Sequence, residues 1–249
     1  SPELRKELKR QGRTFKTTSD TEVLLHLYDC KGVDMVSDLR GMFAFALWDR
    51  AEKTLLLARD PFGIKPLYLA DDGKCLRFAS QVKALLAGGA ISREPDPAGA
   101  AGFFLTGSIP EPFTLYRDIC SFPAGHTMVV RADGPLPTPV PYVSIPAEIA
   151  AGAEQTGSEN FVRERVRAAV RDSVRAHLLA DVDVGLFLSA GVDSSALLGI
   201  MQDVGVSQLR TITLGFECFR GTGDDEVPLA TAVAKHYGAD HTVRRVNKG

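Results

Sequence analysis

The segment Leu186–Ser195, with the sequence LFLSAGVDSS, decides the fold of the second half of the chain. Its apolar beginning is typical of a strand that ends at Leu188, and a helix is expected to start near Ser194. Such a junction of strand, tight loop and helix directs several backbone N–H groups and the positive end of the helix toward one point. The segment therefore predicts an anion-binding site at the end of the strand.

The side chains of this loop suit a phosphate chain together with a metal ion. Gly191 permits a positive φ and the close approach of an anion, and Ser189, Ser194 and Ser195 add hydroxyl donors. Asp193 would repel a bare phosphate, so its presence is explained if Mg²⁺ lies between them. No lysine stands in the loop, which therefore differs from the GxxxxGK[ST] phosphate loop. The alternative is a turn rich in serine and glycine that only closes a βα unit.

Strands and helices are predicted to alternate from residue 158 onward. A helix is expected from about Glu159 to Leu179, with Ser158 as its cap and valines at a spacing of four on one face. The further predicted elements are strand Val184–Leu188, helix Ser194–Gln202, strand Thr211–Phe216, helix Glu226–Tyr237 and strand His241–Val246. This alternation predicts a parallel, doubly wound sheet. Arginines also recur every four residues along the first helix, as an anion-binding stripe or, in the simpler interpretation, as a solvated face.

The first part of the chain is predicted to mix helices with antiparallel strands. The expected elements are a helix over Glu22–Tyr28, a hairpin of Met42–Trp48 and Thr54–Ala58, strands Pro66–Ala70 and Leu76–Ser80 joined by a turn, and a last strand His126–Ala132. The hairpin strands are apolar on both faces. Sheets buried on both faces need a layer on each side, so a stacked α/β arrangement is expected.

Residues 135–157 are the best candidate for a linker. Prolines recur through this stretch, and small residues follow up to Gly157. The predicted organisation is therefore a first domain over residues 1–134, a linker over 135–157 and a second domain over 158–249. The alternative is a long surface loop within one domain.

Composition limits the classes of partner and compartment. The net charge of −2 and the isoelectric point near 6.2 give no field that would hold nucleic acid or a membrane surface. The four cysteines are far apart, which argues against a disulfide framework and a zinc site. No signal peptide and no long apolar span is found. We expect a cytoplasmic protein that binds small molecules.

Several motifs together resemble those of a known family. The loop resembles the SGGxDS pyrophosphate loop of the ATP pyrophosphatases, which split ATP between the α and β phosphates. Ala190 stands where that family usually has glycine, and its methyl group would hinder a left-handed backbone by roughly 1 kcal/mol. The first half carries TSDTE at 18–22, GMFAFA at 41–46, RDPFGIKPLY at 59–68, FAS at 78–80 and PAGH at 123–126. These segments are similar to class II glutamine amidotransferase domains, and the combination resembles glutamine-hydrolysing asparagine synthetases over nearly the whole chain.

The resemblance implies a fold and a set of site residues. The implied fold is α/β: an N-terminal-nucleophile-type α/β/β/α sandwich followed by a doubly wound parallel-sheet nucleotide-binding domain. Asp20 is assigned to the α-amino group of glutamine, because a carboxylate recognises an ammonium, although by itself it could equally cap a helix. Asp193 is also assigned to Mg²⁺. The residues assigned to ATP and pyrophosphate are Leu188, Ser189, Ala190, Gly191, Val192, Asp193, Ser194, Ser195 and Leu214, the last through its backbone to the adenine.

The implied activity is that of an asparagine synthase, an ATP-dependent carbon–nitrogen ligase that hydrolyses glutamine. Its substrates would be glutamine, ATP and aspartate or another carboxylic acid, with ATP and Mg²⁺ as cofactors and a homodimer as one assembly that the resemblance allows. Two alternatives stay open. One is a related amidotransferase that amidates another carboxylate in a secondary or cell-surface pathway. The other is a catalytically degenerate relative that only binds nucleotide.

The resemblance also implies that the chain is cut short at both ends. Class II amidotransferases use an N-terminal cysteine whose own α-amino group acts as the base. This chain opens with Ser1, followed by a charged helix rather than a strand, so Ser1 is a poor substitute. The family's later SGEGSDE loop and acceptor pocket are not found before Gly249. No catalytic residue is therefore assigned, and the 249-residue chain alone is expected to have neither glutaminase nor synthetase activity.

Overall fold

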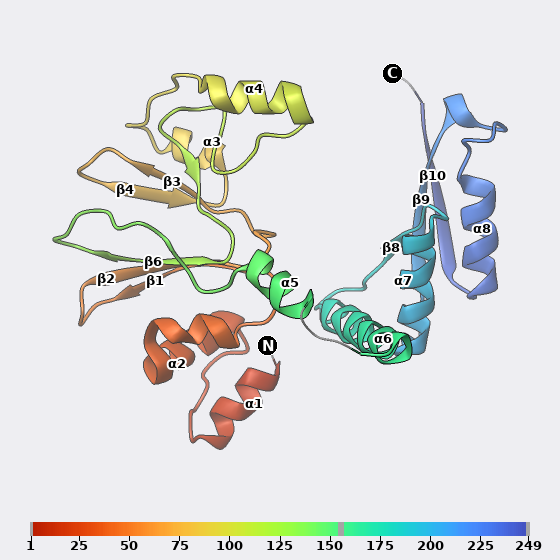
Figure 1. The fold of residues 1–249 in the computed structure, drawn as a ribbon, viewed down its shortest axis with the longest axis horizontal. Coiled ribbons are helices and arrows are strands. Elements are labelled where there is room, and N and C mark those ends of the chain that lie inside the picture. Colours follow the sequence, from red (N-terminus) through yellow and green to blue (C-terminus); the bar gives the residue numbers. More distant parts are fainter. Residues whose placement is uncertain (1, 154–156, 248–249) are drawn as a thin grey trace. The chain divides into compact units, whose positions relative to one another are not determined.

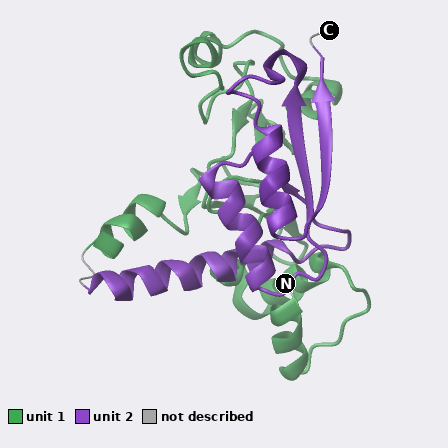
Figure 2. Ribbon diagram, turned by 90° about the vertical axis from the view of Figure 1, so that its right-hand side faces the viewer, with its two compact units in different colours: residues 1–155 green, residues 156–249 purple. Residues whose placement is uncertain are grey.

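The computed structural model describes residues 2–153 and 157–247 of the chain. Two compact units are formed by residues 1–155 and 156–249 (Figure 2). Ser1 and residues 154–156 of the predicted linker lie outside the described residues, as do residues 248–249. Within the described part of the chain, no helix is both long and apolar enough to cross a membrane.

The first unit combines two antiparallel sheets with helices (Figure 1). One sheet has the strand order β1-β2-β6-β7 and the other the order β4-β3-β5. In chain order the elements are α1 (Pro2–Arg10), α2 (Asp20–Lys31), the 3₁₀ helix η1 (Gly32–Asp38), β1 (Ala44–Asp49), β2 (Thr54–Arg59), β3 (Tyr68–Asp71), β4 (Leu76–Ala79), α3 (Val82–Ala87), α4 (Pro97–Thr106), β5 (Cys120–Ser121), β6 (His126–Arg131), β7 (Val140–Pro141) and α5 (Ile145–Ala153). The predicted first helix, the hairpin and the strands near residues 66–80 and 126–132 are confirmed.

Three hydrophobic clusters hold the layers of this unit together. The cluster around Leu57 and Phe122 joins strands of the two sheets. On the other side of β2, Ala58 packs with buried residues of α1, α2 and η1. A third cluster includes Leu85 of α3 and Ala70 of the three-stranded sheet. Strand β2 therefore buries side chains on both faces, as the apolar hairpin predicted.

Part of the predicted linker belongs to the first unit. Val140 and Pro141 form β7, which pairs with β6 at the edge of the four-stranded sheet. Proline is tolerated there because an edge strand leaves one side of its backbone unpaired. Tyr142 continues the attachment: its amide donates to the Gly125 carbonyl at 3.0 Å, and its hydroxyl donates to the Arg59 carbonyl at 2.9 Å. The helix α5 follows, so residues 140–153 are structured where the sequence predicted a linker.

The second unit is built on a parallel sheet with the strand order β10-β9-β8. Its elements are α6 (Glu159–His177), β8 (Leu186–Phe187), α7 (Val192–Asp203), β9 (Arg210–Phe216), the 3₁₀ helix η2 (Glu217–Phe219), α8 (Val227–His236) and β10 (Asp240–Val246). The core joins Leu198 of α7 and Ala230 of α8 to Leu188 at the end of β8. The predicted alternation is confirmed, although β8 is shorter than the predicted strand.

Helix α6 packs only partly into this core. Ser158 caps it, since its hydroxyl accepts the Phe161 amide at 3.3 Å. Val174 contacts the core, but Val162 and Val166 are exposed. The arginine row pairs with carboxylates: the pairs are Arg163–Glu159, Arg167–Glu164 and Arg171–Asp203. These ion pairs favour the solvated face over the anion-binding stripe.

Candidate functional site

The loop after β8 is anchored to the neighbouring strand β9 at its first residue. The Leu188 amide donates to the Ile212 carbonyl at 2.9 Å, and the Thr213 hydroxyl donates to the Leu188 carbonyl at 2.6 Å. Leu188 and Thr213 are both buried. The start of the loop is therefore fixed by the sheet, while the residues beyond it reach the surface.

The left-handed residue of the loop is Ala190, with a φ of +61°. This is the position at which the sequence comparison with the family's glycine raised the cost of a left-handed backbone, whereas Gly191 does not use the positive φ that it permits. Gly191 has a φ of −64° and a ψ of 159°, because it caps α7, and its carbonyl accepts the Ser195 amide at 3.0 Å. An alanine in the left-handed region costs roughly 1–2 kcal/mol, so the loop holds its turn against a local penalty.

The serine hydroxyls of the loop bond to one another and to its backbone. The Ser189 and Ser194 hydroxyl oxygens lie 3.1 Å apart, and the Ser194 hydroxyl donates to the Gly191 carbonyl at 3.2 Å. The Ser189 and Gly191 amides donate to these hydroxyls at 3.3 and 3.4 Å. Bonds of this length are weak. Ser189 and Gly191 are exposed, so an anion can reach these weakly bonded groups.

Helix α7 begins directly after this loop and is 12 residues long. Val192 and Asp193 lie in its exposed first turn, where the unpaired amides and the helix dipole favour an anion. In the described residues no group of three or more His, Cys, Asp and Glu side chains could hold a metal ion. Asp193 can therefore supply one ligand to Mg²⁺, and phosphate oxygens and water would have to supply the others. That division suits Mg²⁺, which binds proteins through one or two carboxylates plus phosphates.

Leu214 lies in β9 beside the start of the loop. The parallel register pairs Phe187 of β8 with Ile212 of β9, so Leu214 follows two residues beyond the last pair. Its side chain is 46% exposed. The structure thus brings Leu214 and the loop Leu188–Ser195 together at the carboxyl ends of parallel strands, where open α/β sheets bind ligands.

Asp20 is the first residue of α2 in the other unit, and it is exposed. The cap of this helix is Ser19, whose hydroxyl accepts the Thr21 amide at 3.2 Å. The alternative that Asp20 serves as the cap is therefore not needed. Glu22 fixes the preceding loop, because its carboxylate accepts the amides of Lys16 and Thr17, each at 2.7 Å. The hydrogen bond from the Lys16 amide, followed by that from the Thr17 hydroxyl, lowers the pKa of Glu22 to about 2.

Two adjacent buried charged residues at the end of β2, Arg59 and Asp60, were not predicted as structural or functional from the sequence. Arg59 is 4% exposed, and its guanidinium donates to Glu111 and Ser121 side chains at 2.7 and 3.0 Å. Asp60 is fully buried and binds backbone amides instead. A charged pair directly after a strand of buried apolar residues was the available signal.

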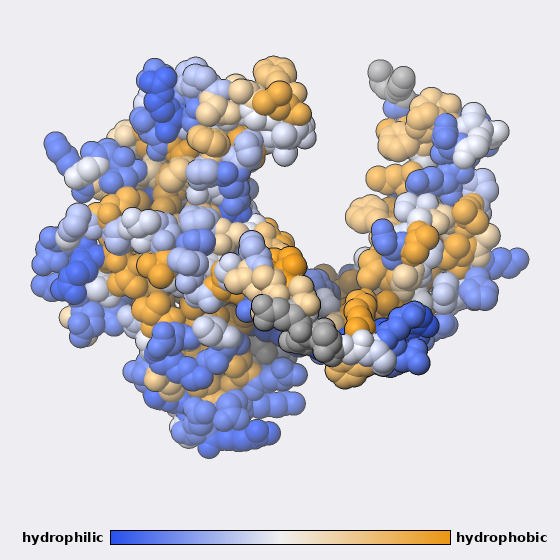
Figure 3. Space-filling model, viewed as in Figure 1, coloured by the Kyte–Doolittle hydropathy of each residue, from blue (hydrophilic) through white to orange (hydrophobic). Residues whose placement is uncertain are grey.

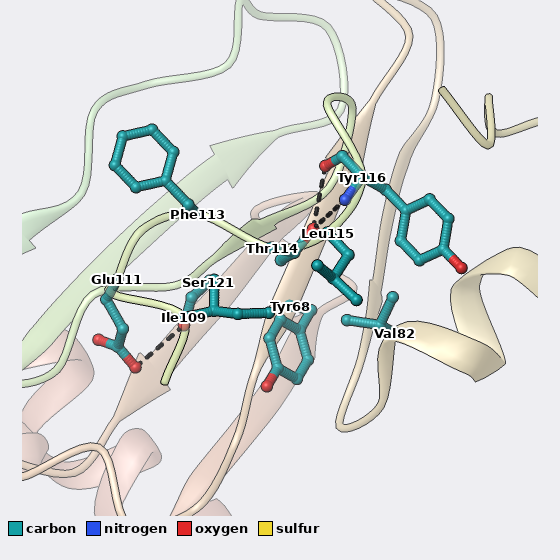
Figure 4. Close-up of a pocket in the computed structure, with 9 residues that line it drawn as sticks. All are labelled: Tyr68, Val82, Ile109, Glu111, Phe113, Thr114, Leu115, Tyr116 and Ser121. Atoms are coloured by element: carbon teal, nitrogen blue, oxygen red, sulfur yellow. Dashed lines mark hydrogen bonds between the residues drawn. The ribbon is translucent and has the colours of Figure 1, made fainter. Parts of the chain in front are cut away.

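A shallow pocket of about 210 Å³ lies beside the Arg59 cluster in the first unit (Figure 4). Glu111 and Ser121 line it, and the Ser121 hydroxyl donates to the Glu111 carboxylate at 3.1 Å. Tyr68 and Tyr116 provide aromatic walls. Asp20, the residue predicted to bind glutamine, does not line this pocket.

Each half of the chain matches the sequence model of a known protein family. The sequence model described as "Glutamine amidotransferase domain" matches residues 1–140, and that described as "Asparagine synthase" matches residues 165–249. The chain belongs to the glutamine-hydrolysing asparagine synthetase family.

Three relatives illustrate the range of proteins that are similar to this chain. Asparagine synthetase [glutamine-hydrolyzing] 1 of Bacillus subtilis (strain 168) is 37% identical over 239 residues, which cover 96% of this chain and 36% of the relative. A putative asparagine synthetase of Mycobacterium tuberculosis (strain H37Rv) is 37% identical over 253 residues, 98% of this chain and 37% of the relative. Amidase chry2 of Gibberella zeae is 30% identical over 246 residues, 92% of this chain and 35% of the relative. The chain thus spans little more than a third of these relatives' length.

Proposed function

We propose that this chain carries the glutamine amidotransferase domain and the ATP-binding part of a glutamine-dependent asparagine synthetase. Glutamine is hydrolysed to ammonia in the first domain. In the second, ATP adenylates the side-chain carboxylate of aspartate, and ammonia attacks the acyl-adenylate to give asparagine, AMP and pyrophosphate. The observation that carries the proposal is the loop Leu188–Ser195, which is exposed at Ser189 and at residues 191–193 and ends in the first turn of α7 with Leu214 beside it.

The loop would stabilise the negative charge that builds on the departing pyrophosphate. The amides of Gly191 and Val192 and the hydroxyls of Ser189, Ser194 and Ser195 supply the donors. Asp193 would hold Mg²⁺, which when bound neutralises part of the phosphate charge. The Leu214 backbone is proposed to contact the adenine.

The first domain would recognise glutamine through Asp20. The proposal is supported by the exposed position of Asp20 at the beginning of α2, a helix that Ser19 caps. An α-ammonium facing this carboxylate would form a charge-assisted hydrogen bond.

The finer architecture belongs to the same proposal. We infer an N-terminal-nucleophile-type α/β/β/α sandwich whose last strand, β7, lies within the predicted linker 135–157, and a doubly wound synthetase domain that begins at residue 158. The layered clusters of the first unit and the parallel pairing in the second support this architecture. A cytoplasmic homodimer remains part of the proposal.

The exchange of ATP with labelled pyrophosphate tests the role of Asp193. In the full-length protein, Asp193→Asn should lower aspartate-dependent exchange a hundredfold or more, as expected for the loss of an electrostatic contact in the transition state. Its thermal stability should stay within about 1 kcal/mol of the wild type, because the residue is exposed. Asp203→Asn is the matched control, since Asp203 closes the same helix and pairs with Arg171. Unchanged exchange in Asp193→Asn would remove this residue from the mechanism.

Glutamine dependence tests the role of Asp20. Asp20→Ala should raise the KM for glutamine strongly while synthesis from added ammonia persists. Asp29→Ala, on the same helix and paired with Arg13, is the control that should leave both activities unchanged. An equal loss of ammonia-driven and glutamine-driven synthesis would assign Asp20 to a structural role.

A second candidate acceptor is a carboxylic acid other than aspartate, and the similarity to a relative named as an amidase favours testing it. A series of carboxylic acids should be compared for the ATP–pyrophosphate exchange that each supports. Exchange with aspartate alone would support aspartate as the acceptor. Stronger exchange with another acid would identify that acid as the acceptor instead. A nucleotide that binds without any exchange would indicate a degenerate relative.

A further inference from the structure

A half-buried ion pair lies beside the carboxyl end of β9 and is not part of the loop that carries the phosphate-binding motif. The Asp225 carboxylate lies 3.2 Å from Nη2 of Arg245, and the Asp225 side chain is only 6% exposed. Asp225 lies between η2 and α8, whereas Arg245 lies in β10. The pair therefore ties the connection after β9 to the neighbouring strand (Figure 1).

Asp225 also organises the connection itself. One carboxylate oxygen accepts the Gly221 amide at 3.3 Å, and the other accepts the Val227 amide at 3.2 Å. Val227 is the first residue of α8. A single side chain thus fixes the loop over residues 217–226 and the beginning of the helix that follows it.

The same contacts press against β9 next to Leu214. A Cβ built on Gly215 would lie 2.7 Å from Cγ2 of Val227 and 3.4 Å from Nη1 of Arg245. Gly215 therefore permits the close approach of both groups to the strand. The register pairs Arg245 directly with Gly215, so the ion pair is adjacent to the backbone that we assign to the adenine.

The guanidinium of Arg245 needs Asp225 to stay in this position. Its Nη1 is buried and has no hydrogen-bond partner within the described part of the chain, and Glu217 lies 3.9 Å from its Nε. A buried donor without a partner is costly, so the carboxylate is the principal compensation. Burial alone would raise the pKa of Asp225, but the hydrogen bonds from Gly221, Val227 and Arg245 lower it overall.

We propose that Asp225 and Arg245 are positioning residues for the nucleotide: they fix the loop over residues 217–226 as a wall of the ATP site and hold the Leu214–Gly215 backbone in register. This inference rests on the proposed function, because it needs the second unit to bind ATP. Neither side chain is assigned a contact with the reacting phosphates.

Binding and kinetics in the full-length protein test the proposal. Asp225→Asn and Arg245→Met should each weaken the binding of ATP with Mg²⁺, measured by calorimetry, about tenfold or more. The KM for ATP should rise in parallel, whereas the KM for glutamine should change less than about twofold. Because each change breaks the same pair, the double variant should be hardly weaker than either single one. The matched control is the exposed pair Arg171–Asp203 of the same unit, for which Arg171→Met should leave ATP binding unchanged.

The outcomes separate this inference from the proposed function. Unchanged ATP affinity in Arg245→Met, which leaves the amide contacts of Asp225 in place, overturns the inference even if Asp225→Asn fails to fold. Additive losses in the two single variants overturn it as well, because they would show that the residues act separately. A wild-type protein that does not bind ATP overturns the proposed function, and the inference with it.

Discussion

At the scale of single residues, Asp60 shows how a charge can organise a fold. Its fully buried carboxylate accepts four backbone amides. Those of Phe62 and Ile64 bond to one oxygen at 3.1 and 3.0 Å. Those of Phe43 and Lys65 bond to the other at 3.2 and 3.0 Å. The loop after β2 and the chain before β1 are therefore joined through one side chain.

We expect Asp60→Asn to lower the free energy of unfolding of the first unit by about 3 kcal/mol, since an amide NH₂ would face two backbone donors and the charge would be lost. Urea unfolding followed by the fluorescence of Trp48, the single tryptophan, measures this because Trp48 lies in β1 of the same unit. Asp133→Asn, at an exposed position, is the control. A shift as small as that of the control would show that the loop does not depend on the carboxylate.

The backbone strain at Ala190 can be tested by comparing the stabilities of two variants, one with glycine and one with valine at this position. With a φ of +61°, position 190 should favour glycine over valine, because a β-branched residue fits the left-handed region worst. Ala190→Gly relieves the strain but increases the entropy of the unfolded chain. The two effects oppose each other, so the free energy of unfolding should change by less than about 1 kcal/mol. Ala190→Val should cost more than about 1 kcal/mol.

Ala196 is exposed within α7, and the same two substitutions there should have the opposite order of stability. In a helix interior glycine costs about 1 kcal/mol and valine less, so Ala196→Val should be the more stable variant there. Unfolding followed by circular dichroism gives all four midpoints. The same order at both positions would contradict the left-handed assignment of Ala190.

At the scale of elements, the beginning of α2 depends on pH through Glu22. Hydrogen bonds from Lys16 and Thr17 depress its pKa from 4.5 to about 2. A carboxylate with a depressed pKa stabilises the fold above its unfolded pKa, and this contribution is lost as the pH falls. We expect the wild type to lose stability between about pH 4.5 and pH 2, and Glu22→Gln to lose less over the same range.

Thr17→Val, which removes one of the hydrogen-bond donors to Glu22, should give an intermediate pH profile. Acid titrations at fixed urea concentrations, followed by Trp48 fluorescence, provide the measurement. Parallel profiles for the wild type and Glu22→Gln would show that these hydrogen bonds persist in the unfolded chain or do not form.

Most elements could be predicted from sequence because their signals are local. Periodic apolar residues and the caps Ser19 and Ser158 indicate α2 and α6, and alternation of strand and helix indicates the parallel sheet. The strand β7 could not be predicted, because two residues among prolines become a strand only by pairing with β6. The exposure of Val162 on α6 could not be predicted either. The spacing of the valines shows which face of the helix is apolar, but it does not show what packs against that face.

The candidate site shows the same limit. Leu188–Ser195 is continuous in sequence, so its motif indicated the loop, and the departure from the family's glycine drew attention to the backbone at Ala190. Arg59 and Glu111 are far apart in the chain, as are Asp225 and Arg245, and their pairing depends on sheet register. A single sequence contains no regular spacing from which such pairs could be predicted.

At the scale of the whole molecule, the hydrophobic surface is uneven. Exposed Phe104 and Leu105 end α4, where Figure 3 shows hydrophobic surface. In the second unit, Phe187, Leu214 and Phe216 are exposed on the strands. Parallel sheets are usually covered on both faces, and in the described core α7, α8 and part of α6 supply the packing partners of this sheet. Apolar side chains are therefore exposed on both β8 and β9 of the parallel sheet.

The chain should unfold as two units, because each described hydrophobic cluster lies within one of them. Leu198 is fully buried in the cluster of the second unit. Leu198→Ala should therefore cost about 2–5 kcal/mol in that unit through the cavity it leaves. Trp48 fluorescence, which reports only the first unit, should keep its wild-type urea midpoint while the circular dichroism signal gains an earlier transition.

Asp60→Asn supplies the reciprocal control, since it should move the Trp48 midpoint and leave the transition of the second unit in place. The two effects should add in the double variant within about 0.5 kcal/mol, as they do for sites that share no partners. Should Leu198→Ala shift the Trp48 midpoint by as much as the circular dichroism midpoint, the two units would unfold as one cooperative structure. The two units would then have separate hydrophobic cores but would not unfold independently.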